Sequence, residues 1–109
     1  RLFRLGSAAA IRQKVSFPAS GSWQQVPGTI LYLIDDTAGE PVDPRWRRIA
    51  VVFNGAAWPV RQAAAAARGD WRLHPVQEAG ADPIVRASRV EDGAFAVPGR
   101  TAAVFVEPR

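Results

Sequence analysis

Acidic residues are the first candidates for chemistry, and four of them lie close together at Asp35, Asp36, Glu40 and Asp43. Hydrolysis by a pair of carboxylates requires one group on each side of the scissile bond. Asp35 and Asp36 are adjacent, so at a strand end their side chains point to opposite faces. We interpret them as turn acids that end a strand. The alternative is a calcium site built from all four acids, but their spacing does not match the helix-loop-helix calcium loop.

The other residue types that carry catalysis are scarce. His74 is the only histidine, and we expect it at a strand end in a structural or solvent-facing role. The chain has no cysteine, which excludes disulfides and thiolate metal ligands. Ser7 follows Gly6 but lacks the second glycine of a nucleophile elbow, and no glycine loop of the phosphate-binding type is present. The sequence therefore predicts no catalytic residue, no metal ligand and no cofactor.

The four tryptophans are the remaining candidates for a binding site. An exposed indole can stack on the apolar face of a sugar ring while the polar rim of the sugar stays hydrated. Trp58 stands before Pro59 in a predicted loop and is the first carbohydrate-contact candidate, and Trp46 is the second. We expect Trp23 and Trp71 in the core or at an interface. The alternative for Trp58 is packing against the sheet or a partner domain.

Size and charge narrow the possible classes of function. A chain of 109 residues with 48% hydrophobic and 22% charged residues fits a single globular domain with one core. The net charge is +4, and the basic residues are arginines apart from Lys14, spread along the chain with one cluster at Arg45, Arg47 and Arg48. This weak, dispersed charge argues against a nucleic-acid-binding module, which stays a minor alternative. No apolar run approaches the roughly 18 residues of a membrane-spanning helix.

The first residue of the sequence and its amino-acid composition lead to two expectations about its origin. The chain begins at Arg1 and contains no methionine, so we expect it to be a piece of a longer polypeptide whose active residues lie elsewhere. The preference for arginine over lysine and the abundance of alanine are typical of a GC-rich bacterial genome. The cellular location of the parent is left open, with secretion or the cell surface as possibilities.

The elements that must position these residues are mostly strands. Ser7 is a suitable N-cap for one short helix over residues 8–15. The runs at 29–34 and 48–53 are continuous, apolar and β-branched, which predicts strands buried on both faces. After the second run, Asn54-Gly55 predicts a tight turn, because this pair tolerates positive φ.

The second half of the chain predicts further short strands at even spacing. We expect an edge strand at 60–68, although the five alanines at 63–67 leave a helix as the alternative. Strands are also expected at 71–76, 84–90, 94–97 and 101–106. Seven or eight strands with one short N-terminal helix predict an all-β fold, an antiparallel β-sandwich.

Short motifs that follow one another along the chain give the sequence a family resemblance. In the first half they are Leu2-Phe3-Arg4-Leu5-Gly6, Ile11, Val15-Ser16-Phe17-Pro18, Pro27-Gly28 and Ile34-Asp35-Asp36. In the second half they are Val51-Val52-Phe53-Asn54, Trp71, Leu73-His74-Pro75-Val76-Gln77, Asp82-Pro83, Phe95-Ala96-Val97-Pro98 and 100–106. In this order, the motifs make the chain resemble the C-terminal domain of pullulanase-type α-1,6-glucosidases. The alanine run at 63–67 departs from that pattern, where more β-branched residues are usual.

The resemblance implies a β-sandwich appended to a catalytic (β/α)-barrel of the α-amylase superfamily, which hydrolyses α-1,6 branch links in pullulan and starch. The catalytic carboxylates of such enzymes belong to the barrel, so none is carried onto this chain. The resemblance implies one domain over 1–109, with 1–17 as a linking segment and 18–109 as the sandwich. Leu2, Phe3 and Leu5 are then candidates for the barrel interface. The expected role is a non-catalytic domain that packs against and stabilises the barrel, and the alternative is a glucan-binding module that uses Trp58 or Trp46.

Overall fold

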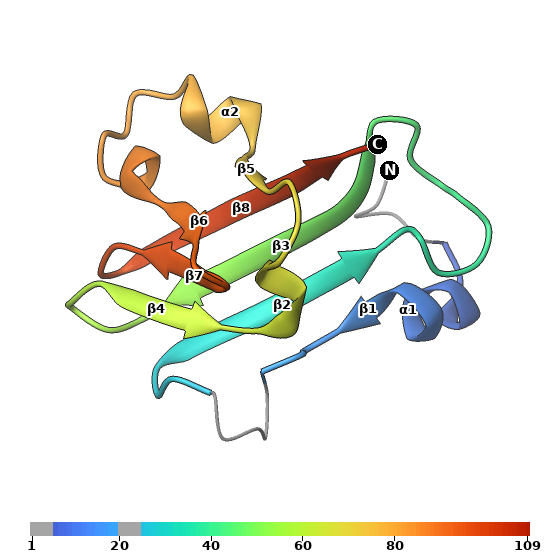
Figure 1. The fold of residues 1–109 in the computed structure, drawn as a ribbon, viewed down its shortest axis with the longest axis horizontal. Helices are drawn as coiled ribbons and strands as arrows, with labels where there is room; N and C mark the ends of the chain where they lie inside the picture. Colours follow the sequence, from blue (N-terminus) through green and yellow to red (C-terminus); the bar gives the residue numbers. More distant parts are fainter. Residues whose placement is uncertain (1–5, 20–24) are drawn as a thin grey trace.

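Two antiparallel sheets stacked in layers form the protein, as seen in a computed structural model that describes residues 6–19 and 25–109 (Figure 1). Sheet A has the spatial order β1 (Val15–Ser16), β2 (Thr29–Asp35), β3 (Trp46–Asn54), β8 (Thr101–Pro108) and β5 (Arg72–Leu73). Sheet B has the order β4 (Val60–Ala63), β7 (Ala94–Val97) and β6 (Arg89–Glu91). This arrangement confirms the predicted all-β antiparallel sandwich with one short N-terminal helix.

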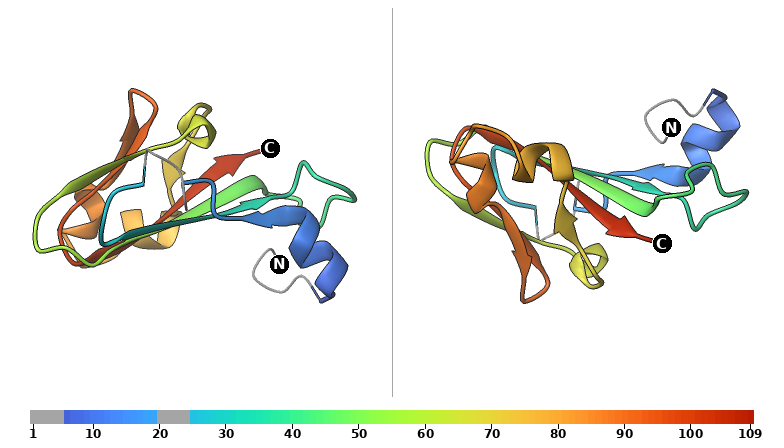
Figure 2. Two further views of the ribbon diagram at one scale, coloured as in Figure 1. Left: turned by 90° about the horizontal axis from the view of Figure 1, so that it is seen from below. Right: turned by 90° about the horizontal axis from the view of Figure 1, so that it is seen from above.

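The N-terminal helix α1 (Ala8–Lys14) forms where the sequence predicts it. Its N-cap Ser7 accepts a hydrogen bond from the backbone N–H of Ala10 at 3.1 Å, which satisfies one of the free donors of the first turn. The helix ends where Val15 turns into an extended conformation and begins β1. In Figure 2, α1 lies on the side of sheet A that faces away from sheet B.

The core lies between the two sheets and contains the inward side chains of both. Phe95 of β7 and Phe105 of β8 are fully buried, with ring centroids 5.3 Å apart. The rings of Trp71 and Phe95 pack in a T-shaped arrangement, with centroids 5.6 Å apart. Each large apolar side chain buried in this way stabilises the fold by roughly 1.5–3 kcal/mol. Trp71 is therefore a core residue, one of the two positions expected for it.

Strands at 29–34 and 48–53 are confirmed as β2 and β3, but their predicted burial on both faces holds only in part. Ile34 and Ile49 are buried on the outer face of sheet A, whereas Ile30 is 54% exposed and Phe53 is 47% exposed. Of the residues that the structure describes, none covers that end of the outer face.

Two predicted strands are shorter than expected because turns replace part of them. In the 71–76 segment only β5 is extended, and helix α2 (Pro75–Glu78) follows His74. Proline suits the first position of a helix because it has no N–H to satisfy there. In the 84–90 segment, the 3₁₀ helix η2 (Val85–Ala87) precedes β6, after the side chain of Asp82 accepts a hydrogen bond from the N–H of Ile84. An aspartate turn of this kind competes with extended structure.

The ambiguous segment 60–68 contains both a strand and a helical turn. Its first four residues form β4, and the alanines then form the 3₁₀ helix η1 (Ala65–Ala67). The indole N–H of Trp71 donates to the carbonyl of Ala66 at 2.7 Å and so ties this turn to the core. The expected edge strand is therefore right for β4, which includes Ala63, and wrong for Ala65–Ala67, which form a helical turn.

The turn predicted from Asn54-Gly55 is also different, since neither residue has a positive φ. The Asn54 side chain instead accepts from the N–H of Ala56 and donates to the carbonyls of Trp58 and Pro98. These bonds hold the loop that connects sheet A to sheet B.

Over residues 6–19 and 25–109, no helix has both the length and the apolar character needed to cross a bilayer.

Candidate functional site

The carboxylate of Asp36 lies at the centre of a buried polar cluster just beyond the end of β2. The residue is fully buried, and its two oxygens accept hydrogen bonds from the backbone N–H groups of Val42 and Asp43 at 2.9–3.0 Å. The ammonium of Lys14 lies 3.0 Å from Oδ1, and the guanidinium of Arg109 pairs with Oδ2. Asp36 therefore connects α1, the loop after β2 and the last residue of the chain.

Lys14 supplies one of the two cations of this cluster, from the C-terminal end of α1. Its side chain is only 3% exposed, and its Nζ also donates to the carbonyls of Ala38 and Glu40 at 2.6 Å and 2.8 Å. Two carbonyls and one carboxylate thus surround an ammonium group rather than a metal ion. Within the described part of the chain, no three histidine, cysteine or acidic side chains converge as metal ligands, so the calcium alternative gains no support.

The environment of Asp36 keeps its carboxylate ionised. Burial by itself would raise the pKa, but the N–H of Asp43, the Lys14 ammonium, the N–H of Val42 and the Arg109 guanidinium outweigh it and lower the pKa from 3.8 to about 2. A general acid must hold a proton near neutral pH. Asp36 is therefore unsuited to acid catalysis, and its oxygens are already engaged in structural contacts.

A second buried carboxylate, Glu107, is found near the end of β8. Arg48 binds it in a bidentate manner at 2.7 Å and 2.8 Å, and the N–H of Asp70 and the side chain of Arg47 approach at 3.2 Å and 3.3 Å. The hydrogen bond from Arg48 lowers the pKa of Glu107 against the opposing effect of burial, and the same bond raises the pKa of Arg48. The Arg48 guanidinium also lies 4.7 Å from the ring centroid of Trp71, so this pair covers the core.

His74 has a structural position between β5 and α2. Its Nδ1 accepts a hydrogen bond from the N–H of Val76 at 3.1 Å, which caps α2. Burial, and next the positive charge of Arg45, lower the pKa of His74 below its usual 6.5. A histidine that accepts through Nδ1 and resists protonation fits a helix cap.

The sequence-predicted binding residues are distributed over different parts of the molecule. Trp58 is in the loop between β3 and β4 and is 67% exposed, so much of the residue is accessible to a ligand. Trp46 is half-buried at the start of β3, between the guanidinium of Arg45 at 5.8 Å and the ring of His74 at 6.1 Å. The other predicted positions, Leu2, Phe3, Leu5 and Trp23, lie outside the described residues.

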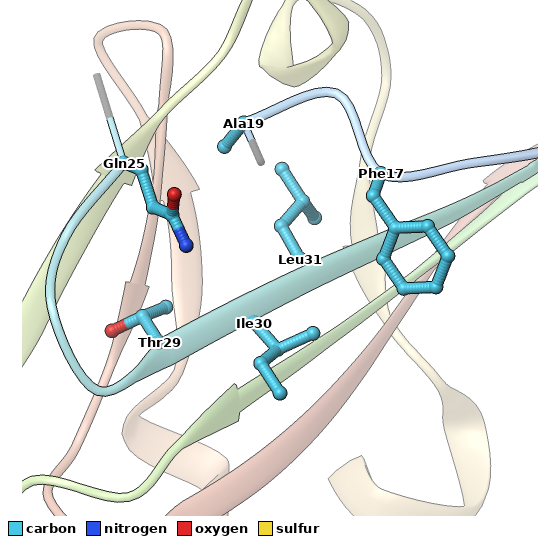
Figure 3. Close-up of a pocket in the computed structure, with 6 residues that line it drawn as sticks. All are labelled: Phe17, Ala19, Gln25, Thr29, Ile30 and Leu31. Atoms are coloured by element: carbon cyan, nitrogen blue, oxygen red, sulfur yellow. The ribbon is translucent and has the colours of Figure 1, made fainter. Parts of the chain in front are cut away.

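Figure 3 shows a half-open pocket of about 340 Å³ beside β2. It is lined by Phe17, Ala19, Gln25, Thr29, Ile30 and Leu31. None of these six side chains is ionisable, so they offer a largely apolar contact surface with no acid or base. The two most exposed of its apolar residues, Phe17 and Ile30, are each 54% exposed.

Sequence reasoning did not find the cluster of Lys14, Asp36 and Arg109. The partners of Asp36 are 22 and 73 residues away, and no local spacing rule connects them. A weak signal was available, because Lys14 is the only lysine in a chain that otherwise uses arginine.

Comparison with known proteins gives consistent matches over the whole chain. The family described as "Alpha-1,6-glucosidases, pullulanase-type, C-terminal" matches residues 1–108. The curated relative Pullulanase 1, chloroplastic, from Arabidopsis thaliana is 39% identical over 116 residues, which cover 99% of this chain and 12% of the relative.

Solved structures give the same result. The maltotriose complex of PulA from Klebsiella pneumoniae matches with a TM-score of 0.86 and 30% identity, over 99% of this chain and 12% of that one. A mutant pullulanase from Paenibacillus barengoltzii complexed with maltotetraose matches with a TM-score of 0.71 and 28% identity, over 99% of this chain and 14% of that one. These relatives come from both a plant and bacteria, so the matches support the expected bacterial origin only in part. The chain spans about an eighth of the relatives it matches.

Proposed function

We propose a role that proceeds from one premise: this chain belongs to the family of C-terminal domains of pullulanase-type α-1,6-glucosidases. The domain is a non-catalytic part of an enzyme that cleaves α-1,6 branch links in pullulan or starch. It packs against the catalytic (β/α)-barrel of that enzyme and stabilises it. Residues 1–17 link the two parts, with Leu2, Phe3 and Leu5 against the barrel.

The observation that supports the non-catalytic role is that the two carboxylates at the centres of the buried clusters are held in the ionised form. Asp36 and Glu107 are each held by cationic side chains and backbone N–H groups, and both have lowered pKa values. A glycosidase of the usual type needs one carboxylic acid with a raised pKa and a second carboxylate across the substrate bond. These two groups stabilise the fold instead, which leaves the chemistry to the rest of the parent chain.

Truncation of the parent enzyme tests this role. We expect the intact enzyme to release reducing sugar from pullulan, the 109-residue chain alone to release none, and the enzyme without these residues to lose activity at a lower temperature. The measurements are reducing-sugar release and residual activity after heating. Hydrolysis by the 109-residue chain, or equal heat resistance with and without it, would contradict the proposal.

A second candidate function, glucan binding, is favoured by the exposure of Trp58. Its indole is 67% exposed, and a flat apolar ring in that position can stack on a glucose unit. Trp46, the other carbohydrate-contact candidate, offers less surface because it is half-buried. We expect Trp58→Ala to reduce retardation in gels that contain pullulan or amylopectin. Ile84→Ala is the matched control, since Ile84 is 57% exposed. Unretarded migration of the unmodified protein would rule this function out.

A further inference from the structure

The outer face of sheet A is apolar across its three long strands. Strand register places their outward side chains in three rows, namely Ile30, Phe53 and Ala102, then Tyr32, Val51 and Val104, then Ile34, Ile49 and Val106. None of these side chains is charged. The inward face of the same strands forms the main core. Apolar side chains on both faces are typical of a sheet that is buried on both sides.

Among residues 6–19 and 25–109, the side chains that pack on this outer face cover one end of it. Ile34, Ile49 and Val106 are 1–3% exposed, beneath side chains that include Val42 and Trp46. At the other end Ile30 is 54% exposed and Phe53 is 47% exposed. Apolar packing therefore begins on this face and stops partway along the strands.

Phe17 extends the uncovered end beyond the edge of the three strands. It is 54% exposed, and its ring contacts that of Tyr32 with centroids 5.9 Å apart. We call the set formed by Phe17, Ile30, Tyr32, Phe53, Ala102 and Val104 the open patch. A contiguous apolar patch of this kind marks an interaction site, whereas single exposed apolar residues do not.

The outer face of sheet B has the opposite character. Its outward positions include Arg61 of β4 and both Arg89 and Glu91 of β6, and the last two form an ion pair at 3.0 Å. The Arg61 and Arg89 side chains are exposed to solvent. Sheet B thus has a face suited to water, and sheet A has one suited to another apolar surface.

We infer that the open patch is covered by the polypeptide that precedes this domain in the parent chain, an inference that rests on the proposed function. Three observations identify this occupant. The matched relatives are about eight times longer than this chain, and the matching family is described as C-terminal, so most of such a protein precedes the domain. Helix α1, the first described element, lies on the side of sheet A away from sheet B (Figure 2), and strand register places the patch on that same side. The patch also continues the apolar packing that already buries Ile34 and Ile49.

This contact orients the domain within the enzyme. The outer face of sheet A turns toward the preceding polypeptide, and the charged face of sheet B turns toward water. Because the open patch includes central strands, the contact extends well beyond the linking segment 1–17. The covering surface has the chemistry of a protein core, with apolar side chains opposite Ile30 and Phe53.

Hydroxyl-radical footprinting of the full-length parent tests the contact directly. Each side chain's labelling rate is divided by its rate in the urea-unfolded enzyme, which corrects for intrinsic reactivity. Ile84 and Trp58 are the matched controls, since their exposure of 57% and 67% is similar to that of Ile30 and Phe53, and neither belongs to sheet A. We expect Ile30 and Phe53 to be protected severalfold more than the controls.

The possible outcomes separate this inference from the proposed function. Protection of Trp58 and Ile84 with free labelling of Ile30 and Phe53 would mean that the domain docks through another surface, so the inference fails and the proposed function stands. Free labelling of all four residues would overturn the inference, and the truncation experiment would then decide the proposed function separately.

Substitution in the full-length parent gives a second readout. Phe53→Ser should shorten the half-life of pullulan-hydrolysing activity at elevated temperature severalfold, because it weakens the contact. Ile84→Ser, the matched control at a residue that is 57% exposed and outside sheet A, should leave the half-life unchanged. Equal half-lives for the two variants would contradict the inference.

Discussion

The two buried carboxylate clusters place similar groups in different settings. Asp36 is fully buried and lies between a cation from the first helix and one from the last residue of the chain. Glu107 is also buried, but its partners Arg47 and Arg48 have side chains that are 50% and 16% exposed. Water therefore reaches the cations around Glu107 and also Arg109, which is 31% exposed, whereas the Lys14 ammonium has almost no access to it.

This difference determines what each cluster can contribute to stability. A charge that loses its partner in a dry site has no solvent to replace it, and the cost is several kcal/mol. A charge at the margin of the solvent recovers hydration, so the same loss costs less. We expect the Asp36 cluster to contribute more to the free energy of unfolding than the Glu107 cluster, which mainly shields Trp71 from solvent.

Removal of Asp36 should have the largest effect. Asp36→Ala leaves the Lys14 ammonium buried without its carboxylate and should lower the free energy of unfolding by about 3–5 kcal/mol. Urea denaturation of the 109-residue chain measures this. Asp35→Ala is the control, because the Asp35 side chain accepts hydrogen bonds from the N–H and the hydroxyl of Thr37 at an exposed position, and it should cost about 1 kcal/mol or less. Equal losses for the two variants would contradict the comparison.

A methyl group added at Gly69 should disturb the Glu107 cluster. Gly69 has φ +135°, and a Cβ there would lie 2.6 Å from a terminal nitrogen of Arg48 and closer still to the Glu107 carboxylate. Gly69→Ala should cost about 3 kcal/mol, from backbone strain and a displaced ion pair. Gly93→Ala separates the two causes, since Gly93 has φ +74° with open space around it, and should cost only about 1–2 kcal/mol. The same loss for both would show that the ion pair tolerates the methyl group.

Loss of the Glu107 charge should have a smaller effect. Glu107→Gln keeps the shape of the side chain but weakens both bonds from Arg48, so we expect a loss of about 2 kcal/mol in urea denaturation. Glu91→Gln is the control, because its ion pair with Arg89 is exposed and should contribute less than about 1 kcal/mol. A loss as large as that of Asp36→Ala would overturn the order proposed for the clusters.

The two clusters should lose their contributions to the free energy of unfolding in different pH ranges. Both pKa values are lowered by folding, so the unfolded chain binds protons first and stability falls with pH. The Glu107 contribution should begin to fall below pH 4.5, and that of Asp36 should be lost between 3.8 and about 2, on the order of 2 kcal/mol for Asp36. Unfolding free energies measured between about pH 5 and about pH 2 test this. Glu107→Gln should remove only the first part of the loss, and a flat profile for this variant would be inconsistent with an ionised Asp36.

The fold class could be predicted because its signals are local. Residues 29–34 and 101–106 are apolar and β-branched, Ser7 can cap a helix, and the spacing of short runs indicates a sandwich. The prediction was wrong where one hydrogen bond redirected the chain. His74 follows β5 and caps a helix where the strand was expected to continue to residue 76, and Asp82 forms a turn two residues before the expected start of another strand.

The candidate site was less predictable than the fold, because its partners are far apart along the chain. The acids at Asp35 and Asp36 were correctly placed at a strand end, yet their sequence does not say which of them is buried. Asp36 is buried because Lys14 and Arg109 arrive from opposite ends of the chain to neutralise it. Ion pairs between residues so far apart in the sequence depend on the topology of the fold and not on a local spacing of residues.

By itself, the sequence determined the all-β class, the N-terminal helix, the two long central strands and the family, since each depends on local propensity or on motifs in a fixed order. Only the tertiary structure decided which face of sheet A remains open, which carboxylates are buried, and that the Lys14 ammonium fills a site surrounded by oxygen atoms. The physical reason is that burial and charge pairing are properties of neighbours in space. Folding chooses those neighbours from residues that the linear order keeps apart.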